Sequence, residues 1–337
     1  MKTKFISFTA ALAVVLPSFV SAQPTDAQIR SQQPEIQSIQ AGQSIPSQSA
    51  SGVGQQGSSS VGSTDSGMQR PVFIDTGFFS FFAGIDNSLS RKQNPLLLTT
   101  DADIKTAGGH DFTWSKTFSA GTMTNPIDMD SFMLMIVAGG AWTKTDHLIT
   151  EFEALDDFAN SAYLLFMLQH ETGWNYRIGS SYAMMQDSTR ESETYSEFYP
   201  NIGASKSFDL PLDLIGLFDI SGGKHLTTSD SITTTDTKTM DNWDFAVSLG
   251  LKYQLYDLIL SPTYRYSKKI YSTDNTLALN KDRIDYGNTL SFKIDYPVYD
   301  HINLSLGYSF DQRDSTDTTK KYKAWNADAN FGLSMNF

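Results

Sequence analysis

Basic and acidic side chains recur at alternate positions of several segments whose other positions are apolar. The set holds four basic and three acidic residues: Arg177, Lys252, Arg265, Lys293, Asp244, Asp295 and Asp311. Successive side chains of a β-strand point to opposite faces, so these charges would share one face and the apolar residues the other. On the inner wall of a barrel, such a mixed-sign lining holds water and sets a field across a narrow pore. The same charges could instead pair with one another and fill a small barrel.

Enzymatic chemistry has little support in the sequence. The five histidines are the natural candidates for a general base. His147 follows Asp146 and His301 follows Asp300, but neighbours within a turn do not make an oriented dyad. The sequence contains no Gly-x-Ser-x-Gly, no His-Glu-x-x-His and no paired-histidine spacing. We therefore expect a protein without catalytic residues.

No metal or cofactor site is expected either. Asp230, Asp236 and Asp241 lie in a Thr-rich stretch that could offer oxygen ligands to Ca²⁺, but the spacing lacks the Gly and the final Glu of a calcium loop. Neither a zinc spacing nor a phosphate-cradling Gly-rich loop occurs. The absence of Cys excludes disulfides and a lipoprotein attachment site.

The elements that would position the charges are β-strands. The clearest is the last segment, 325–337, in which every second residue is apolar. It is somewhat longer than the roughly 9 to 11 residues that cross a bilayer as a tilted strand. Its aromatic end resembles the C-terminal signal strand that the barrel-assembly machinery recognises in bacterial outer-membrane proteins. This resemblance implies an assembly signal formed by Phe331, Leu333, Met335 and Phe337.

Similar alternation recurs from His110 onward. The expected strands lie at 112–118, 132–138, 148–155, 162–170, 174–184, 195–208, 212–220, 243–253, 258–266, 290–296, 302–310 and 325–337. This pattern predicts an all-β fold, an antiparallel transmembrane barrel of about twelve strands. The stretch 148–162 also fits a helical spacing, which would remove a strand pair or plug the pore.

Short and long connections alternate between these segments. Short ones lie at 171–173, 210–211, 256–257 and 297–300, and long polar ones at 186–192, 227–242, 272–283 and 312–321. Transmembrane barrels of the outer membrane place short turns in the periplasm and long loops outside. An even strand number then leaves both ends of the barrel on the periplasmic side.

The N-terminal third divides into three parts before a barrel at 110–337. Residues 1–22 carry Lys2, Lys4, an apolar run and small residues before a cleavage point, as in a signal peptide. Residues 23–70 are rich in Gln, Ser and Gly and predict a disordered periplasmic linker. The Phe-rich segment 71–109 fits either extra strands or a plug.

The chain is acidic. Its formal charge of −12 becomes −14 when Lys2 and Lys4 leave with the leader. A balance of this sign repels nucleic acid and anionic lipid headgroups. Beyond the leader, no run reaches the 18 or so apolar residues of a transmembrane helix.

Three features resemble the β-barrel porins of the second class, a group that includes barrels accompanying exopolysaccharide export. They are the Gly-x-x-x-Asn-Pro stretch at 121–126, the segment 307–315 and the terminal strand, and the likeness covers about 110–337. The resemblance implies a barrel in the outer membrane of a Gram-negative-type bacterium, surrounded by lipid and lipopolysaccharide and able to form homo-oligomers. It offers no catalytic residues to carry over.

Two functions agree with these features. The first is passive passage of small hydrophilic solutes, or support of polymer export, through a narrow charged lumen. The alternative is a non-conducting structural or adhesive barrel whose surface loops contact partners. An autotransporter fits less well, because fewer than 90 residues would precede the barrel after the leader.

Overall fold

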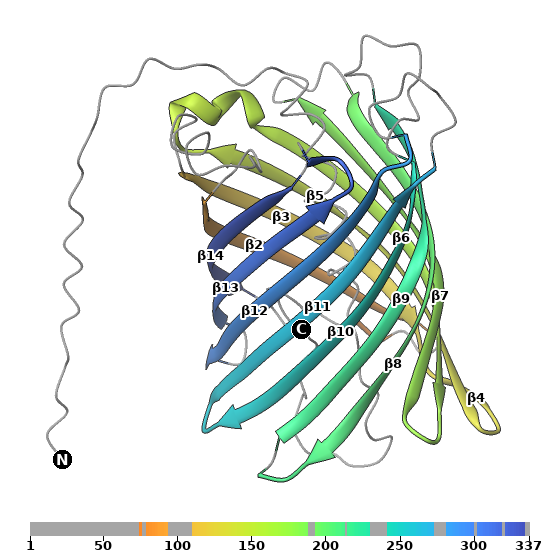
Figure 1. Cartoon of the computed structure of the whole chain (residues 1–337). Coiled ribbons are helices and arrows are strands. Elements are labelled where there is room, and N and C mark those ends of the chain that lie inside the picture. The colour runs from red at the N-terminus through yellow and green to blue at the C-terminus, as the bar shows by residue number, and fades with distance from the viewer. Residues whose placement is uncertain are drawn as a thin grey trace, which may run out of the picture.

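The chain forms a closed antiparallel barrel (Figure 1). The computed structural model describes residues 74–75, 79–93, 110–187, 193–212, 214–229, 241–272, 281–299, 302–318 and 321–333. The barrel strands are β2 (Phe79–Gln93), β3 (His110–Thr124), β5 (Phe132–His147), β6 (Asp157–His170), β7 (Trp174–Asp187), β8 (Glu193–Leu210), β9 (Leu214–Ser229), β10 (Asn242–Leu255), β11 (Leu258–Tyr271), β12 (Ile284–Tyr299), β13 (Ile302–Ser315) and β14 (Tyr322–Leu333). These twelve strands confirm the predicted fold class. Two short strands, β1 (Ile74–Asp75) and β4 (Ile127–Met129), pair with β2 and β5.

Strand β2 closes the barrel. It pairs with β3 along its whole length and with β14 from Asn326↔Lys92 to Leu333↔Ile85. The sequence left the Phe-rich segment 71–109 open between extra strands and a plug, and its residues 79–93 form a wall strand. The barrel therefore begins at Phe79 and not at His110. The leader and the linker lie outside the described residues.

The strand predicted at 148–155 is wrong. This stretch contains η1 (Thr150–Leu155), a 3-10 helix in the connection between β5 and β6. Phe152 is 1% exposed and anchors the helix, whereas the rest of the stretch with helical spacing, from Asp157 on, belongs to strand β6. The carboxylate of Asp156 accepts a hydrogen bond of 2.6 Å from the backbone N–H of His147 and fixes the end of β5. The strand number remains twelve because β2 takes the place of the missing strand.

The barrel has two different ends. We call the short-turn end the one with the connections β4–β5, β6–β7, β8–β9, β10–β11 and β12–β13, and the opposite one the long-loop end. Four turn residues at the short-turn end have positive φ, as tight hairpins require: Asp130, Gly173, Leu212 and Tyr256. The register Leu333↔Ile85 places the start of β2 and the described end of β14 together at the short-turn end.

The two faces of the wall differ in chemistry. Outward positions are apolar and exposed, as at Ile202 (62%), whereas inward positions are polar and covered, as at Asp244 (6%). Among the described residues, 36 large hydrophobic side chains are exposed. A soluble monomer rarely exposes an apolar patch of more than a few hundred Å². The outer wall is therefore suited to lipid.

The inner wall is not polar throughout. On β5 and β6, Met135, Val137, Leu165 and Met167 form a buried apolar cluster, against which Met123 and Tyr163 pack. Polar and charged side chains cover the inner wall from β7 to β13. No helix in the described ranges is both long and apolar enough to cross a membrane.

Candidate pore lining

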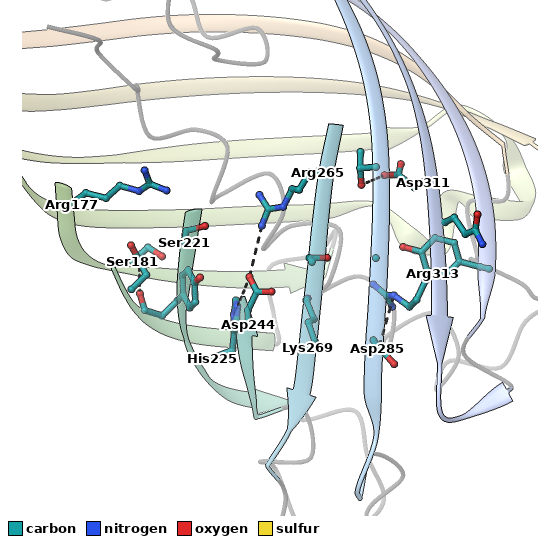
Figure 2. Close-up of a pocket in the computed structure, with 17 residues that line it drawn as sticks. Arg177, Ser181, Ser221, His225, Asp244, Arg265, Lys269, Asp285, Asp311 and Arg313 are labelled. Atoms are coloured by element: carbon teal, nitrogen blue, oxygen red, sulfur yellow. Dashed lines mark hydrogen bonds and ion pairs between the residues drawn. The ribbon is translucent and has the colours of Figure 1, made fainter. Parts of the chain in front are cut away.

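A cavity of about 80 Å³ lies against the inner wall formed by β7 to β14 (Figure 2). Its lining comprises Arg177, Ser181, Tyr199, Asn201, Ser221, His225, Asp244, Arg265, Ser267, Lys269, Asp285, Gly287, Thr289, Asp311, Gln312, Arg313 and Tyr322. Most of these residues belong to the strand halves nearest the long-loop end. The space is polar and large enough for a few water molecules.

His225 on β9 is the centre of a buried group. Its Nδ1 lies 3.0 Å from a carboxylate oxygen of Glu197 on β8, and its Nε2 lies 4.0 Å from a carboxylate oxygen of Asp244 on β10. The Tyr195 hydroxyl donates a hydrogen bond of 2.5 Å to Glu197. The ring of Tyr199 stacks on the imidazole, with 4.0 Å between ring centroids. One imidazole thus separates two buried carboxylates that would otherwise face each other.

Two further cations extend this group toward the cavity. Arg265 on β11 lies 3.8 Å from Asp244, and Figure 2 shows its guanidinium extending over the cavity. Lys269, on the same face of β11, is 8% exposed and acts electrostatically on both Glu197 and Asp244. The wall therefore presents positive charge beside the two carboxylates.

A second ionic group lies at the long-loop end. Asp285 on β12 accepts hydrogen bonds from Arg283 at 2.5 and 2.8 Å and from the Ser315 hydroxyl at 2.6 Å. Arg313 approaches the same carboxylate to 3.8 Å. Tyrosine rings cover both guanidinium groups, Tyr271 that of Arg283 and Tyr322 that of Arg313. These contacts hold the charged groups in fixed positions at the long-loop end of the barrel.

Charged side chains in the middle of the inner wall and toward its short-turn end also have partners. Asp311 accepts hydrogen bonds from Thr289 (2.7 Å) and Asn326 (3.1 Å). Nearer the short-turn end, Lys293 lies 3.0 Å from Asp295, and the charge of Lys252 interacts with both residues. Polar groups thus continue along the wall beyond the cavity.

The structure places the seven residues predicted for the lining at two levels. Arg177, Asp244, Arg265 and Asp311 line the cavity, whereas Lys252, Lys293 and Asp295 lie on the same strands or their neighbours toward the short-turn end. Sequence reasoning missed Glu197, Asp219, His225, Lys269, Asp285 and Arg313. Lys269 and Arg313 lie beyond the ends of the predicted strands, and Asp285 lies before the start of one. Glu197, Asp219 and His225 lie on β8 and β9, where the prediction assigned no inward residues.

The predicted assembly residues are not settled by the geometry. Phe331 and Leu333 belong to β14, while Met335 and Phe337 lie outside the described residues. Their role as a signal for the assembly machinery remains a prediction.

Three of the described histidines have polar partners that their sequence neighbours did not predict. His147 has a carboxylate partner, but it is Asp111 on β3 at 2.5 Å and not its neighbour Asp146. His170 Nδ1 lies 2.6 Å from the Thr172 hydroxyl, whereas the rings of His147 and His225 contact carboxylates on other strands. These rings join strands together.

No group of three metal-ligating side chains occurs within the described ranges. Asp241, one of the three aspartates considered for Ca²⁺, accepts hydrogen bonds from the N–H (2.7 Å) and the hydroxyl (2.9 Å) of Thr227. Asp230 and Asp236 lie outside the described residues.

Comparisons with known proteins identify likenesses of fold. No family model and no curated protein matches the chain. An outer-membrane channel from Pseudomonas putida F1 is similar at 10% identity, with a TM-score of 0.45 over 77% of this chain and 96% of that one. The β domain of the Bordetella autotransporter BrkA gives 12% and 0.43 over 75% and 99%, and the NanC porin gives 9% and 0.42 over 74% and 100%. At these identities and TM-scores the similarities concern the overall fold alone.

Proposed function

We propose that the protein is a porin-like channel of the outer membrane, which lets small hydrophilic solutes diffuse through a narrow charged lumen without chemical conversion. In this proposal the leader directs export, the apolar outer wall lies in lipid, and the short-turn end faces the periplasm.

One observation carries the proposal. Charged and polar side chains follow the inner wall from Asp285 and Arg313 at the long-loop end, through Arg265 and Asp311, to Lys293 at the other. A structural barrel needs only a filled interior, and apolar residues such as those on β5 and β6 fill it well. A polar track along the whole wall is more useful for keeping water and solutes in the lumen.

The alternative, a non-conducting barrel, is favoured by the extent of ion pairing. Arg177, Arg283 and Arg313 all have a carboxylate partner, and the cavity holds only a few water molecules. The same pairing serves a channel by fixing charges at its wall, so the two functions differ in whether the lumen conducts.

Single-channel recording in a planar bilayer separates them. The mature chain, folded as judged by a gel band that shifts on heating, should give steady unitary currents in KCl. Silence of the folded protein, with currents from a reference porin in the same bilayer, would overturn the channel and support the structural alternative.

A further inference from the structure

The outer wall carries a cluster of charge that the lumen does not explain. Lys116 on β3 and Lys144 on β5 are directly opposite each other in the strand register, and both point outward. Like charges at such a cross-strand position destabilise a sheet. Their only carboxylate partner among the described residues is Asp146, which lies 2.5 Å from Lys144 and 3.8 Å from Lys116. Two ammonium groups therefore share a single carboxylate.

Aromatic rings surround this pair. The ammonium of Lys116 lies 3.8 Å from the centre of the Trp114 ring, and that of Lys144 lies 5.8 Å from the centre of the Phe158 ring. Trp142, two residues before Lys144, stacks on Phe158 at 5.7 Å. Trp rings settle at the level of lipid headgroups, which places the two lysines at the interface rather than in the hydrocarbon region.

The outward-facing basic residues are distributed unequally between the two ends of the barrel. Toward the long-loop end, the described outward residues include six cations, which are Arg91, Lys116, Lys144, Lys224, Lys268 and Lys323, against the acids Asp146 and Asp314. Near the short-turn end, Lys206 is the outward cation of the described strands. A cation on the lipid face costs roughly 2–4 kcal/mol at the midplane and about 0–1 kcal/mol near an interface. These six outward cations, which we call the basic belt, thus mark the membrane interface at the long-loop end, although the whole chain is acidic.

We propose that Lys116 and Lys144 bind the phosphate of an outer-leaflet lipid headgroup, as carried by the phosphorylated glycolipid of lipopolysaccharide. This site rests on the proposed outer-membrane location with the long-loop end outside. A phosphate between the two ammonium groups supplies the negative charge that Asp146 alone does not, and the lipid's acyl chains continue down the apolar wall past Phe118 and Trp142. The overall charge, which predicts repulsion of anionic headgroups, is a sum over the whole chain, whereas the headgroup would meet the outward cations of the basic belt.

Native mass spectrometry of the full chain in detergent tests the site. Bisphosphorylated lipid A should remain bound to the wild type, and dephosphorylated lipid A should not. Lys116→Gln with Lys144→Gln should weaken binding roughly 10- to 30-fold, given the usual contribution of each lysine near an anionic surface. Lys206→Gln, the matched change at the other end of the wall, should bind as the wild type does.

Asp146→Asn provides a second variant that keeps both lysines and should bind bisphosphorylated lipid A more tightly. Equal binding by the double Gln variant and the wild type, no gain in Asp146→Asn, or retention of dephosphorylated lipid A to the same degree would each overturn the site. The heat-dependent gel band reports the folded barrel independently, so failure of the lipid site and failure of the proposed channel give different results.

Discussion

Arg177 on β7 and Asp219 on β9 form a two-fold ion pair across the strand that separates them. The two guanidinium–carboxylate distances are 2.5 and 2.9 Å. The side chain of Arg177 crosses the inner face of β8 at Gly203, its register partner. A Cβ added at Gly203 would lie 2.6 Å from Cζ of Arg177, so the close approach requires glycine.

Gly203→Ala should therefore displace the end of the Arg177 side chain and weaken its ion pair with Asp219, at a cost of up to about 1 kcal/mol, the usual range for a partly exposed pair. Urea unfolding in detergent, followed by the heat-dependent gel band, measures the change. Gly250→Ala is the control, because a Cβ at this inward position of β10 would make contacts of 3.4 Å or more. Adding Arg177→Ala should remove part of the penalty of Gly203→Ala, and a fully additive double variant would contradict the proposed steric cause.

Arg265→Gln should shift the ion selectivity of an open channel toward cations. This residue lines the cavity, and its removal leaves the charge of Asp244 less compensated at the wall. Reversal potentials in a KCl gradient measure the shift. Lys268→Gln removes the same charge from the outward face of the same strand and should leave selectivity unchanged. Equal effects of both variants would speak against a lumen at Arg265.

His225→Ala should cost roughly 3–5 kcal/mol of stability, the penalty for removing one partner of a buried ionic group. Without the imidazole, Glu197 and Asp244 lose the group that separates them. The temperature at which the folded gel band disappears is the measurement. His170→Ala, at an exposed position whose ring contacts Thr172, should have little effect. A similar small effect for both histidines would mean that His225 is dispensable.

Much of this architecture could be predicted because alternation is a local signal. The period of two in segments such as 302–310 and 243–253 follows from one face in lipid and one in water, and each strand carries it alone. The strand at 79–93 was harder to recognise, because its outward residues Phe79, Phe81, Ile85 and Leu89 are interrupted by Ala83 and Asn87. The short helix at 150–155 shows the opposite error, since its two acidic residues, Glu151 and Glu153, alternate with apolar ones and fit either period.

The partners within the lining could not be predicted. Asp219 reaches Arg177 over an intervening strand, and His147 pairs with Asp111, 36 residues away in the sequence. Such pairs depend on register and on the staggering of strands around the barrel, which no single segment encodes. Whether a side chain points inward follows from the alternation along its own strand. The charged residues could therefore be assigned to the inner wall, although their partners could not be predicted.

Deleting Phe337 should impair assembly and leave the protein in the periplasm, if the terminal aromatic is read by the assembly machinery. Fractionation and the heat-dependent band measure the yield of folded protein in the outer membrane. Phe337→Tyr keeps an aromatic end and should assemble normally. Normal membrane levels of the deleted form would contradict the assembly signal.

Two N-terminal deletions should have opposite effects on folding, depending on whether they keep strand β2. A chain without residues 23–73 keeps β2 and should fold into a closed barrel, because the β2–β14 pairing from Ile85 to Lys92 remains intact. A chain without residues 23–109 lacks that strand, which leaves β3 and β14 with unpaired edges in lipid, where each unsatisfied backbone group costs several kcal/mol. The second chain should show no heat-dependent band. If it folded as well as the first, β2 would not be a wall strand, and the barrel would have to close between β3 and β14.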